Sequence, residues 1–202
     1  MRQIPIFPLG MPVMPFTAVP LHLFEDRYRV MMDHLMEGDR TLGFVMIERG
    51  SEVGGGDTRR DVGTLARIVE ADQLDDGRWL IIAAGSERMR VVAWLPDDPY
   101  PRGAVETLEH GEVLTADAAD LQAAVRRMAA LAAELGEPGP PIDLTLADDP
   151  VIAAYQALAA TPIGPLDMQR ALETNDAVER HEMVTRLLAD AEELLRLQIG
   201  SG

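Results

Sequence analysis

Short apolar runs separated by turn residues fill the first half of the chain, and their lengths predict β-strands. Residues 63–71 alternate weakly between apolar and polar positions, as a partly buried strand does. The Asp76-Gly77 pair predicts a hairpin turn, and Gly85 with Ser86 predicts a break between two later strands. The predicted strands cover residues 6–9, a segment beginning at Pro20, and residues 41–47, 63–71, 79–84, 88–95 and 102–108.

One helix interrupts these strands. The segment from Pro20 to Arg29 begins as a strand and passes directly into a helix expected over residues 25–37. Glu25 and Asp26 then lie in the first helical turn, where the helix dipole favours negative charge. Several short strands at this spacing predict a small barrel or sandwich with one inserted helix.

The second half has the three-and-four spacing of amphipathic helices. A helix is predicted over residues 116–135 and ends at Gly136, a second opens at Pro150 and ends near Thr161, and a third covers residues 165–173. Asn175 is the expected N-cap of a final helix that runs to about residue 197. The buried stripes of the first and last helices are Leu121, Val125, Met128, Ala132 and Leu135, and Val178, His181, Val184, Leu188, Ala191 and Leu195.

A glycine-rich acidic segment, residues 52–61, separates two predicted strands and is expected to be an exposed, mobile loop. Its glycines, Gly54 to Gly56, do not predict a phosphate-binding loop, because such a loop leads into a helix N-terminus and a strand follows here. Arg59 and Arg60 at its end remain candidates for contact with an anionic partner.

Charge and composition exclude several classes of function. The net charge is -16, and acidic residues exceed basic ones in both halves, so nucleic-acid binding is disfavoured. Cysteine is absent, which excludes disulfides, thiolate metal sites and a cysteine nucleophile. All 18 basic residues are arginine, which excludes a Walker A loop, a Schiff base and a Ser-Lys dyad in this chain. No signal peptide or bilayer-spanning run is evident, and a cytoplasmic location is expected.

No residue pattern for catalysis, a metal or a cofactor emerges. The four histidines, His22, His34, His110 and His181, lack the spacing of a metal site and are interpreted as structural or surface residues. The acidic pairs at residues 75–76, 97–98 and 148–149 lie in turns or at a helix start, where carboxylates serve local structure. We therefore expect a protein that is not an enzyme, with no catalytic, metal or cofactor residue.

The order of several motifs resembles one family. The proline-rich opening strands, Phe24-Glu25-Asp26-Arg27-Tyr28-Arg29, residues 63–66, the turn at 76–78 and the segment 85–90 are similar to the substrate-binding N-terminal domain of Lon proteases and its stand-alone relatives. Residues 165–173 and 176–180 are similar to the end of its helical part. The resemblance implies an α+β architecture: a PUA-like β-barrel or sandwich domain over residues 1–112, then a helical bundle of about four helices over residues 113–202.

The resemblance also implies a function. We expect a non-enzymatic protein that binds exposed or unfolded protein segments, with a protease or chaperone as a possible partner and an apolar groove between the two halves as the site. The alternative is a PUA-like module that binds a small ligand or RNA. Candidate partner-binding residues are Met11, Met14, Phe24, Arg27, Tyr28, Arg59 and Arg60.

Structural roles compete with these binding roles. Phe24 is expected in the core, because aromatic residues are scarce in this chain. Arg27 is expected to form an ion pair or cap that ties the helix to the barrel. The methionines of the first half suit either an adaptable binding surface or an irregular core, and a core role is favoured.

Overall fold

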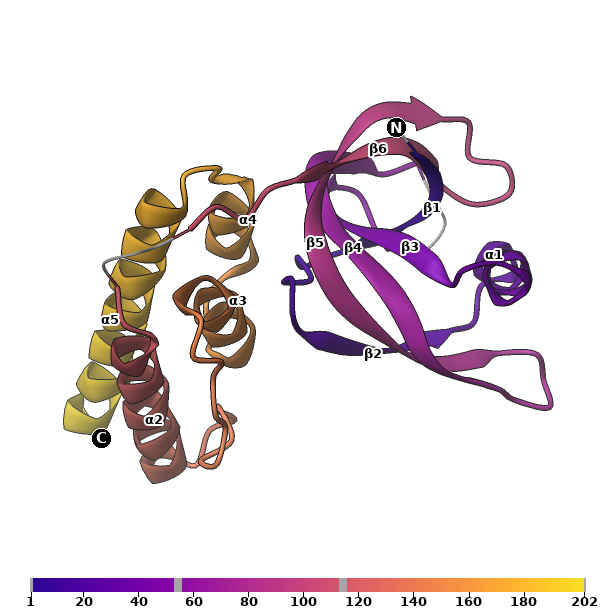
Figure 1. The fold of residues 1–202 in the computed structure, drawn as a ribbon. Coiled ribbons are helices and arrows are strands. Elements are labelled where there is room, and N and C mark those ends of the chain that lie inside the picture. Colours follow the sequence, from indigo (N-terminus) through magenta and orange to yellow (C-terminus); the bar gives the residue numbers. More distant parts are fainter. Residues whose placement is uncertain (1, 53–55, 113–115, 202) are drawn as a thin grey trace. The chain divides into compact units, whose positions relative to one another are not determined.

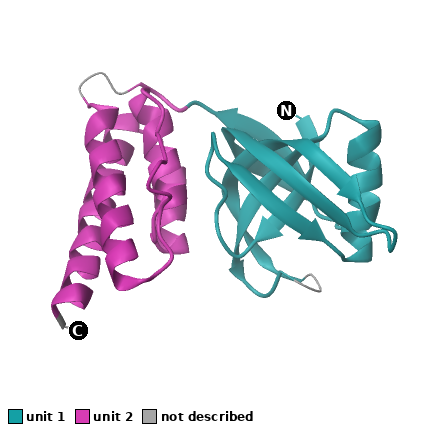
Figure 2. Ribbon diagram, turned by 90° about the horizontal axis from the view of Figure 1, so that it is seen from below, with its two compact units in different colours: residues 1–109 teal, residues 110–202 magenta. Residues whose placement is uncertain are grey.

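The computed structural model describes residues 2–52, 56–112 and 116–201, which form a mixed six-stranded sheet and five helices (Figure 1). The chain divides into two compact units, Met1–Glu109 and His110–Gly202 (Figure 2). The interpretation of the two halves as domains that meet at residues 112 and 113 stays a prediction. The first unit contains β1 (Arg2–Leu9), β2 (Ala18–Leu23), α1 (Asp26–Glu37), β3 (Thr41–Arg49), β4 (Thr58–Gln73), β5 (Trp79–Leu95) and β6 (Arg102–Leu108).

Five strands of the first unit close into a ring. The sheet order is β2-β5-β4-β3-β1-β6, and β5 also pairs with β6. The ring is therefore β1-β3-β4-β5-β6, and β6 closes it by pairing with β1 on one side and β5 on the other. β1 and β3 are parallel, and the other pairs are antiparallel. The ring removes most sheet edges and leaves β2 at the border of the sheet.

Two apolar clusters stabilise this unit. One is enclosed by ring residues such as Ile6, Val45 and Met89. The other gathers beneath α1, where Met31, Met32 and Leu35 pack with Phe44 and other buried side chains. Because neighbouring residues of β3 enter different clusters, the sheet is buried on both faces, which explains why its strands read as continuous apolar runs.

The predicted break at Gly85 and Ser86 is wrong: β5 is continuous from Trp79 to Leu95. Against β4, Ala66 pairs with Gly85 and Leu65 with Glu87, so Ser86 is an extra residue in β5. Such a bulge reverses which alternate residues face which side of the sheet. Trp79, Ile81 and Ala83 therefore enter the cluster under α1, whereas Met89 and Val91 enter the ring.

The acidic glycine-rich segment is shorter than expected. β4 already begins at Thr58, so Arg59 and Arg60 belong to a strand. The side chain of Arg59 is largely buried by ion pairs with Asp57 and Asp97, at 2.5 and 2.6 Å. These ion pairs hold Arg59, which was predicted to lie in the loop, within β4 of the sheet. Val53, Gly54 and Gly55 lie outside the described residues.

The described part of the second unit is helical, with α2 (Ala118–Leu135), α3 (Pro150–Ala160), α4 (Pro165–Glu173) and α5 (Ala177–Ser201). α2 begins at the N-cap Asp117 and ends at Gly136, whose φ of +69° needs the left-handed conformation that glycine adopts easily. The prediction that Asn175 is the N-cap of α5 is wrong. The N-cap is Asp176, whose carboxylate accepts the amides of Val178 and Glu179 at 2.8 and 2.9 Å.

The predicted buried stripes are mostly confirmed. Leu121, Val125, Met128 and Ala132 are buried on α2, with Leu135 partly buried. On α5, Val184, Leu188, Ala191 and Leu195 are buried. Val178 is exposed and His181 is only partly buried, so the predicted buried stripe is wrong at the start of α5.

A buried arginine, Arg180, joins separate segments of the helical unit. Its side chain is only 1% exposed. It donates to the carbonyl oxygen of Thr174 at 2.7 Å and to that of His110, and it lies 5.2 Å from the centre of the Tyr155 ring. Because a buried guanidinium requires hydrogen-bond acceptors, these carbonyls hold the start of α5 against the segments around Thr174 and His110.

Replacing Arg180 by methionine, which keeps similar bulk, should lower the free energy of unfolding by about 3 kcal/mol, because two carbonyl groups lose their donor. Urea unfolding followed by far-UV circular dichroism measures this change. Arg170→Met is the control: the Arg170 side chain is 70% exposed, and its loss should change stability by less than about 0.5 kcal/mol. Equal midpoints for the two variants would contradict a stabilising role for Arg180.

Gly63→Ala should destabilise the first unit by about 2 kcal/mol or more, because the added Cβ would lie 1.9 Å from the carbonyl oxygen of Phe44 on the paired strand. Tryptophan fluorescence during urea unfolding reports on this unit, since both tryptophans, Trp79 and Trp94, lie in it. Gly164→Ala is the control, because no atom beyond its two chain neighbours lies within 4 Å of its added Cβ. An unchanged fluorescence midpoint in Gly63→Ala would show that β3 and β4 can separate without loss of stability.

Candidate functional site

The edge strand β2 is the basis of the candidate site (Figure 1). One side of β2 pairs with the first part of β5. The amide of Gly85 donates to the carbonyl oxygen of Thr17 at 2.8 Å. Because the backbone direction alternates along a strand, the polar groups of Ala18, Pro20 and His22 point away from β5. Pro20 has no N–H to leave unpaired, which suits an edge position.

An exposed apolar surface lies on β2 and the adjoining part of β5. It is made of Pro20, His22, Phe24, Leu80 and Ile82, and is called the β2 surface below. Pro20 pairs with Ile82 and His22 with Leu80, while the rings of His22 and Phe24 are 6.0 Å apart. Phe24 is 52% exposed and Leu80 is 45% exposed. A hollow of about 420 Å³ is lined in part by Pro20, His22, Leu80 and Ile82.

Two carboxylates flank the β2 surface. On β4, Glu70 pairs with Ile82 and Asp72 with Leu80, and both acidic residues line the same hollow. The surface is therefore apolar along β2 and β5 and negative along β4. This arrangement favours a ligand that has both apolar and basic side chains.

A narrow cleft separates β2 from the end of β1. The cleft, of about 100 Å³, is lined by Phe7, Pro8, Leu9, Leu21, His22, Leu23, Phe24, Glu25, Tyr28 and Glu52. The pairing of β1 with β6 stops at Pro5, and the amide of Ile6 donates to Pro101. Beyond that point, β1 pairs with β3 alone among the described residues. β1 and β2 thus present two strand edges that do not pair with each other. This feature is called the β1–β2 cleft.

Arg27 contacts the two acidic residues that line the β1–β2 cleft, Glu25 and Glu52. Its guanidinium forms an ion pair with Glu25 at 3.1 Å and donates to the carbonyl oxygen of Glu52 at 3.1 Å. The carboxylate of Glu52 in turn accepts the amide of Gly10, just after β1. Arg27 thus connects the start of α1 to the segments that follow β1 and β3, which confirms the expected ion-pair role.

Tyr28 supplies a buried hydroxyl group to the cleft. Tyr28 is 3% exposed, and its hydroxyl has no hydrogen-bond partner among the described residues. Burial raises the pKa of Tyr28 to about 12, although the charge of Arg27 opposes this shift. The hydroxyl is therefore protonated at neutral pH and can donate a hydrogen bond to a carbonyl group that enters the cleft.

The structure brings together three of the predicted binding residues, Phe24, Arg27 and Tyr28. The expectation that Phe24 lies in the core is wrong: Leu23, the preceding residue, takes the core position with 1% exposure, and alternation turns Phe24 outward. Met14 is 1% exposed and belongs to the core, whereas Met11 is 55% exposed. The methionines therefore divide between core and surface.

Arg59 and Arg60 are engaged in ion pairs. Arg59 pairs with Asp57 and Asp97 and lies 5.3 Å from the Trp94 ring centre. Burial lowers the pKa of Arg59, but hydrogen bonds from its guanidinium to Asp97 and Asp57 outweigh that effect and hold the pKa above its usual value. Arg60 pairs with Glu48 at 3.1 Å. Their role in partner binding stays a prediction, and these contacts give both arginines a structural role.

Several residues of the site were not identified from the sequence: Pro20, His22, Glu52, Leu80 and Ile82. Pro20 carries a signal that was present, because proline inside a strand indicates an edge. Leu80 and Ile82 carry no such signal, since a partly buried strand and a strand that binds a partner show the same alternation of apolar and polar residues. Glu52 reaches Gly10 across 42 residues, which no local pattern reveals.

The described residues contain no cluster of three or more histidine, cysteine or acidic side chains that could hold a metal ion. Among them, no helix combines the length and apolar character needed to cross a membrane. The chemistry that this site offers is contact with apolar groups, basic groups and an extended backbone.

Comparison with known proteins agrees with this fold. The "Lon protease" of Desulfosudis oleivorans is 28% identical over 208 residues, which cover 97% of this chain and 25% of that protein. The chain thus spans about a quarter of the length of the curated relatives it matches. Two solved structures share the fold. The Lon N-terminal domain protein from Xanthomonas campestris has a TM-score of 0.69 at 21% identity and covers 94% of this chain and 98% of its own.

The second solved structure is the N-terminal domain of the Mycobacterium avium complex Lon protease, with a TM-score of 0.67, 18% identity, and coverage of 94% of this chain and 99% of its own. Residues 3–190 match the family described as the ATP-dependent protease La (LON) substrate-binding domain. This match covers both units, and the chain therefore belongs to the LON substrate-binding domain family.

Proposed function

We propose that this chain binds exposed, extended segments of other proteins at the β2 surface and the β1–β2 cleft. The observation that carries the proposal is a free strand edge beside exposed apolar side chains, Phe24 and Leu80. Family membership supports protein segments as the general kind of ligand. The proposal rests on the first unit and replaces the groove between the two halves as the suggested site.

An extended segment fits this edge for a geometric reason. Successive side chains of an extended chain point to opposite sides, and its backbone offers one donor and one acceptor per residue. A segment that lies along β2 can bond to the backbone groups of Ala18 and His22, while alternate side chains contact the β2 surface. Its carbonyl groups can accept from Tyr28. Folded proteins have few such free segments, so the mode of binding selects unfolded ones.

The relatives support a proposed link to proteolysis. In the proteins named Lon protease, the matching region makes up about a quarter of the chain. We propose that segments captured here are delivered to a protease or chaperone partner, and that this chain itself carries out no catalysis. The absence of lysine and cysteine from the sequence supports this, because a Walker A loop and a Ser-Lys dyad both need lysine.

Replacing both Phe24 and Leu80 by serine should weaken binding of a fluorescently labelled, permanently unfolded protein by tenfold or more, since each loses an exposed apolar contact worth about 1 kcal/mol or more. Fluorescence anisotropy gives the dissociation constants. Val92→Ser is the matched control, because Val92 is also exposed on β5, at 39%, but lies outside the site.

Binding of the folded form of the same protein should be undetectable at equal concentration. Equal affinity for both forms, or an unchanged affinity in the double variant, would reject this site. Tight binding of RNA at low salt, where phosphate contacts are strongest, would support the nucleic-acid alternative.

The acidic flank should set a preference for basic peptides. The double variant Glu70→Gln/Asp72→Asn should reduce the ratio of affinities for a basic and an acidic peptide of equal hydrophobicity about fivefold, and the loss should shrink as salt is raised. The control is Asp33→Asn/Glu37→Gln on α1, which removes the same charge from exposed positions elsewhere. If both double variants change the ratio equally, net charge rather than this flank sets the preference.

A further inference from the structure

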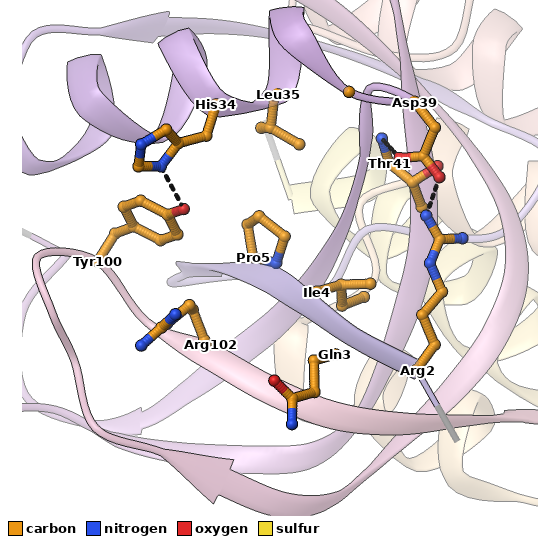
Figure 3. Close-up of a pocket in the computed structure, with 11 residues that line it drawn as sticks. Arg2, Gln3, Ile4, Pro5, His34, Leu35, Asp39, Thr41, Tyr100 and Arg102 are labelled. Atoms are coloured by element: carbon orange, nitrogen blue, oxygen red, sulfur yellow. Dashed lines mark hydrogen bonds and ion pairs between the residues drawn. The ribbon is translucent and has the colours of Figure 1, made fainter.

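A further pocket lies on the first unit, between α1, β1 and the segment that leads into β6 (Figure 3). Its volume is about 290 Å³, and it is lined by Arg2, Gln3, Ile4, Pro5, His34, Leu35, Gly38, Asp39, Thr41, Tyr100 and Arg102. None of these residues belongs to the β2 surface or the β1–β2 cleft. The volume has room for about ten groups of the size of water, which suits a small molecule.

The pocket has two polar ends with an apolar stretch between them. Figure 3 shows Arg2, Asp39 and Thr41 at one end, and His34, Tyr100 and Arg102 at the other, with Ile4, Pro5 and Leu35 between them. At the first end the charges are satisfied: Arg2 forms an ion pair with Asp39, whose carboxylate also accepts the amide of Thr41 at 3.1 Å. Burial raises the pKa of Asp39, but the Thr41 hydrogen bond and the Arg2 charge outweigh it and hold that pKa below its usual value.

The other end carries the positive charge of Arg102. His34 Nδ1 and the Tyr100 hydroxyl are hydrogen-bonded at 2.8 Å, so these two groups satisfy each other. Arg102 has no carboxylate within ion-pair distance among the described residues, and its Nε is buried with no hydrogen-bond partner there. A buried guanidinium nitrogen without an acceptor is unfavourable, and a bound acceptor would remove that cost.

We propose that this pocket binds a small monocarboxylate whose carboxylate is held by Arg102 and whose apolar body lies against Ile4, Pro5 and Leu35. A planar carboxylate matches the fork of a guanidinium and accepts two of its N–H groups.

The charge count favours one negative charge. Arg2 and Asp39 cancel, which leaves only Arg102 to balance a ligand. A phosphate, with nearly two charges, would leave charge unpaired in a protein whose net charge is already -16. A simple inorganic ion has no apolar group to contact the apolar stretch of the pocket. The ligand should therefore also carry an aromatic or branched aliphatic group.

Titration of the full chain with benzoate, followed by two-dimensional NMR, tests this proposal. We expect saturable shifts in residues that line the pocket, with a dissociation constant between about 0.1 and 10 mM, as for small ligands with one charged contact. Benzamide, which has the same shape without the charge, should bind at least tenfold more weakly, and inorganic phosphate likewise.

Arg102→Gln should reduce benzoate affinity at least tenfold, while Arg102→Lys should retain part of it. Arg67→Gln is the control, since Arg67 is an exposed arginine of β4 that does not line the pocket. A thermal melt of each variant shows whether the fold is kept, and Arg102→Lys decides the matter if Arg102→Gln does not fold. Equal binding of benzoate and benzamide, shifts confined to other regions, or no saturation by about 100 mM would overturn the proposal.

This proposal is independent of polypeptide binding. Benzoate should bind equally well to the Phe24→Ser/Leu80→Ser variant, and an unfolded protein should bind equally well to Arg102→Gln. Competition between benzoate and the unfolded protein for one site would show that the two pockets are not separate, and would overturn the assignment of benzoate to this one.

Discussion

Two fully buried arginines hold the backbone at the place where the first unit ends and the second begins. Arg88 and Arg180 are each 1% exposed. Within the first unit Arg88 donates to the carbonyl oxygen of Glu109, and within the second Arg180 donates to that of the next residue, His110. Burying a guanidinium without acceptors costs several kcal/mol, so each unit depends on its carbonyl being in place. The last residue of the first unit and the first residue of the second unit are thus each held by a buried arginine of their own unit.

The same property of arginine recurs where segments distant in the sequence meet. Arg27 links Glu25 to the carbonyl of Glu52, and Arg59 links Asp57 to Asp97. Each guanidinium serves two acceptors at once, which a lysine ammonium does with less geometric control. Whatever genome composition led to a chain without lysine, the fold uses the fork shape of arginine at these junctions. Charge in this protein is therefore partly structural, whereas the buried Nε of Arg102 has no hydrogen-bond partner among the described residues.

Features of the structure that depend on local interactions could be predicted from the sequence, whereas features that depend on contacts between distant segments could not. The helix over residues 165–173 has the predicted bounds, and the helix predicted over residues 116–135 is observed over 118–135, because hydrophobic period, N-cap and, in the second case, a terminating glycine are local signals. The continuity of β5 was not predictable, because Ser86 becomes a bulge only through its register with β4. Asn175 and Asp176 are both good N-caps, and no local pattern distinguishes them; in the structure Asp176 accepts the first amides of α5. Likewise, the candidate site combines the edges of β1 and β2, and neither strand's sequence indicates that the two edges lie near each other.

Phe24 shows why composition misleads about the site. A scarce aromatic residue is expected inside, and leaving half of it exposed sacrifices about 1 kcal/mol of apolar burial. Alternation along β2 gives one face of the strand to Leu21 and Leu23, which pack on the core, so Phe24 must lie on the other face. With Pro20 and Leu80 it forms a grouped apolar surface beside the free edge of β2, and this grouping is the reason for proposing a binding site there. The edge strand thus contributes one face to stability and leaves the apolar side chains of the other face exposed.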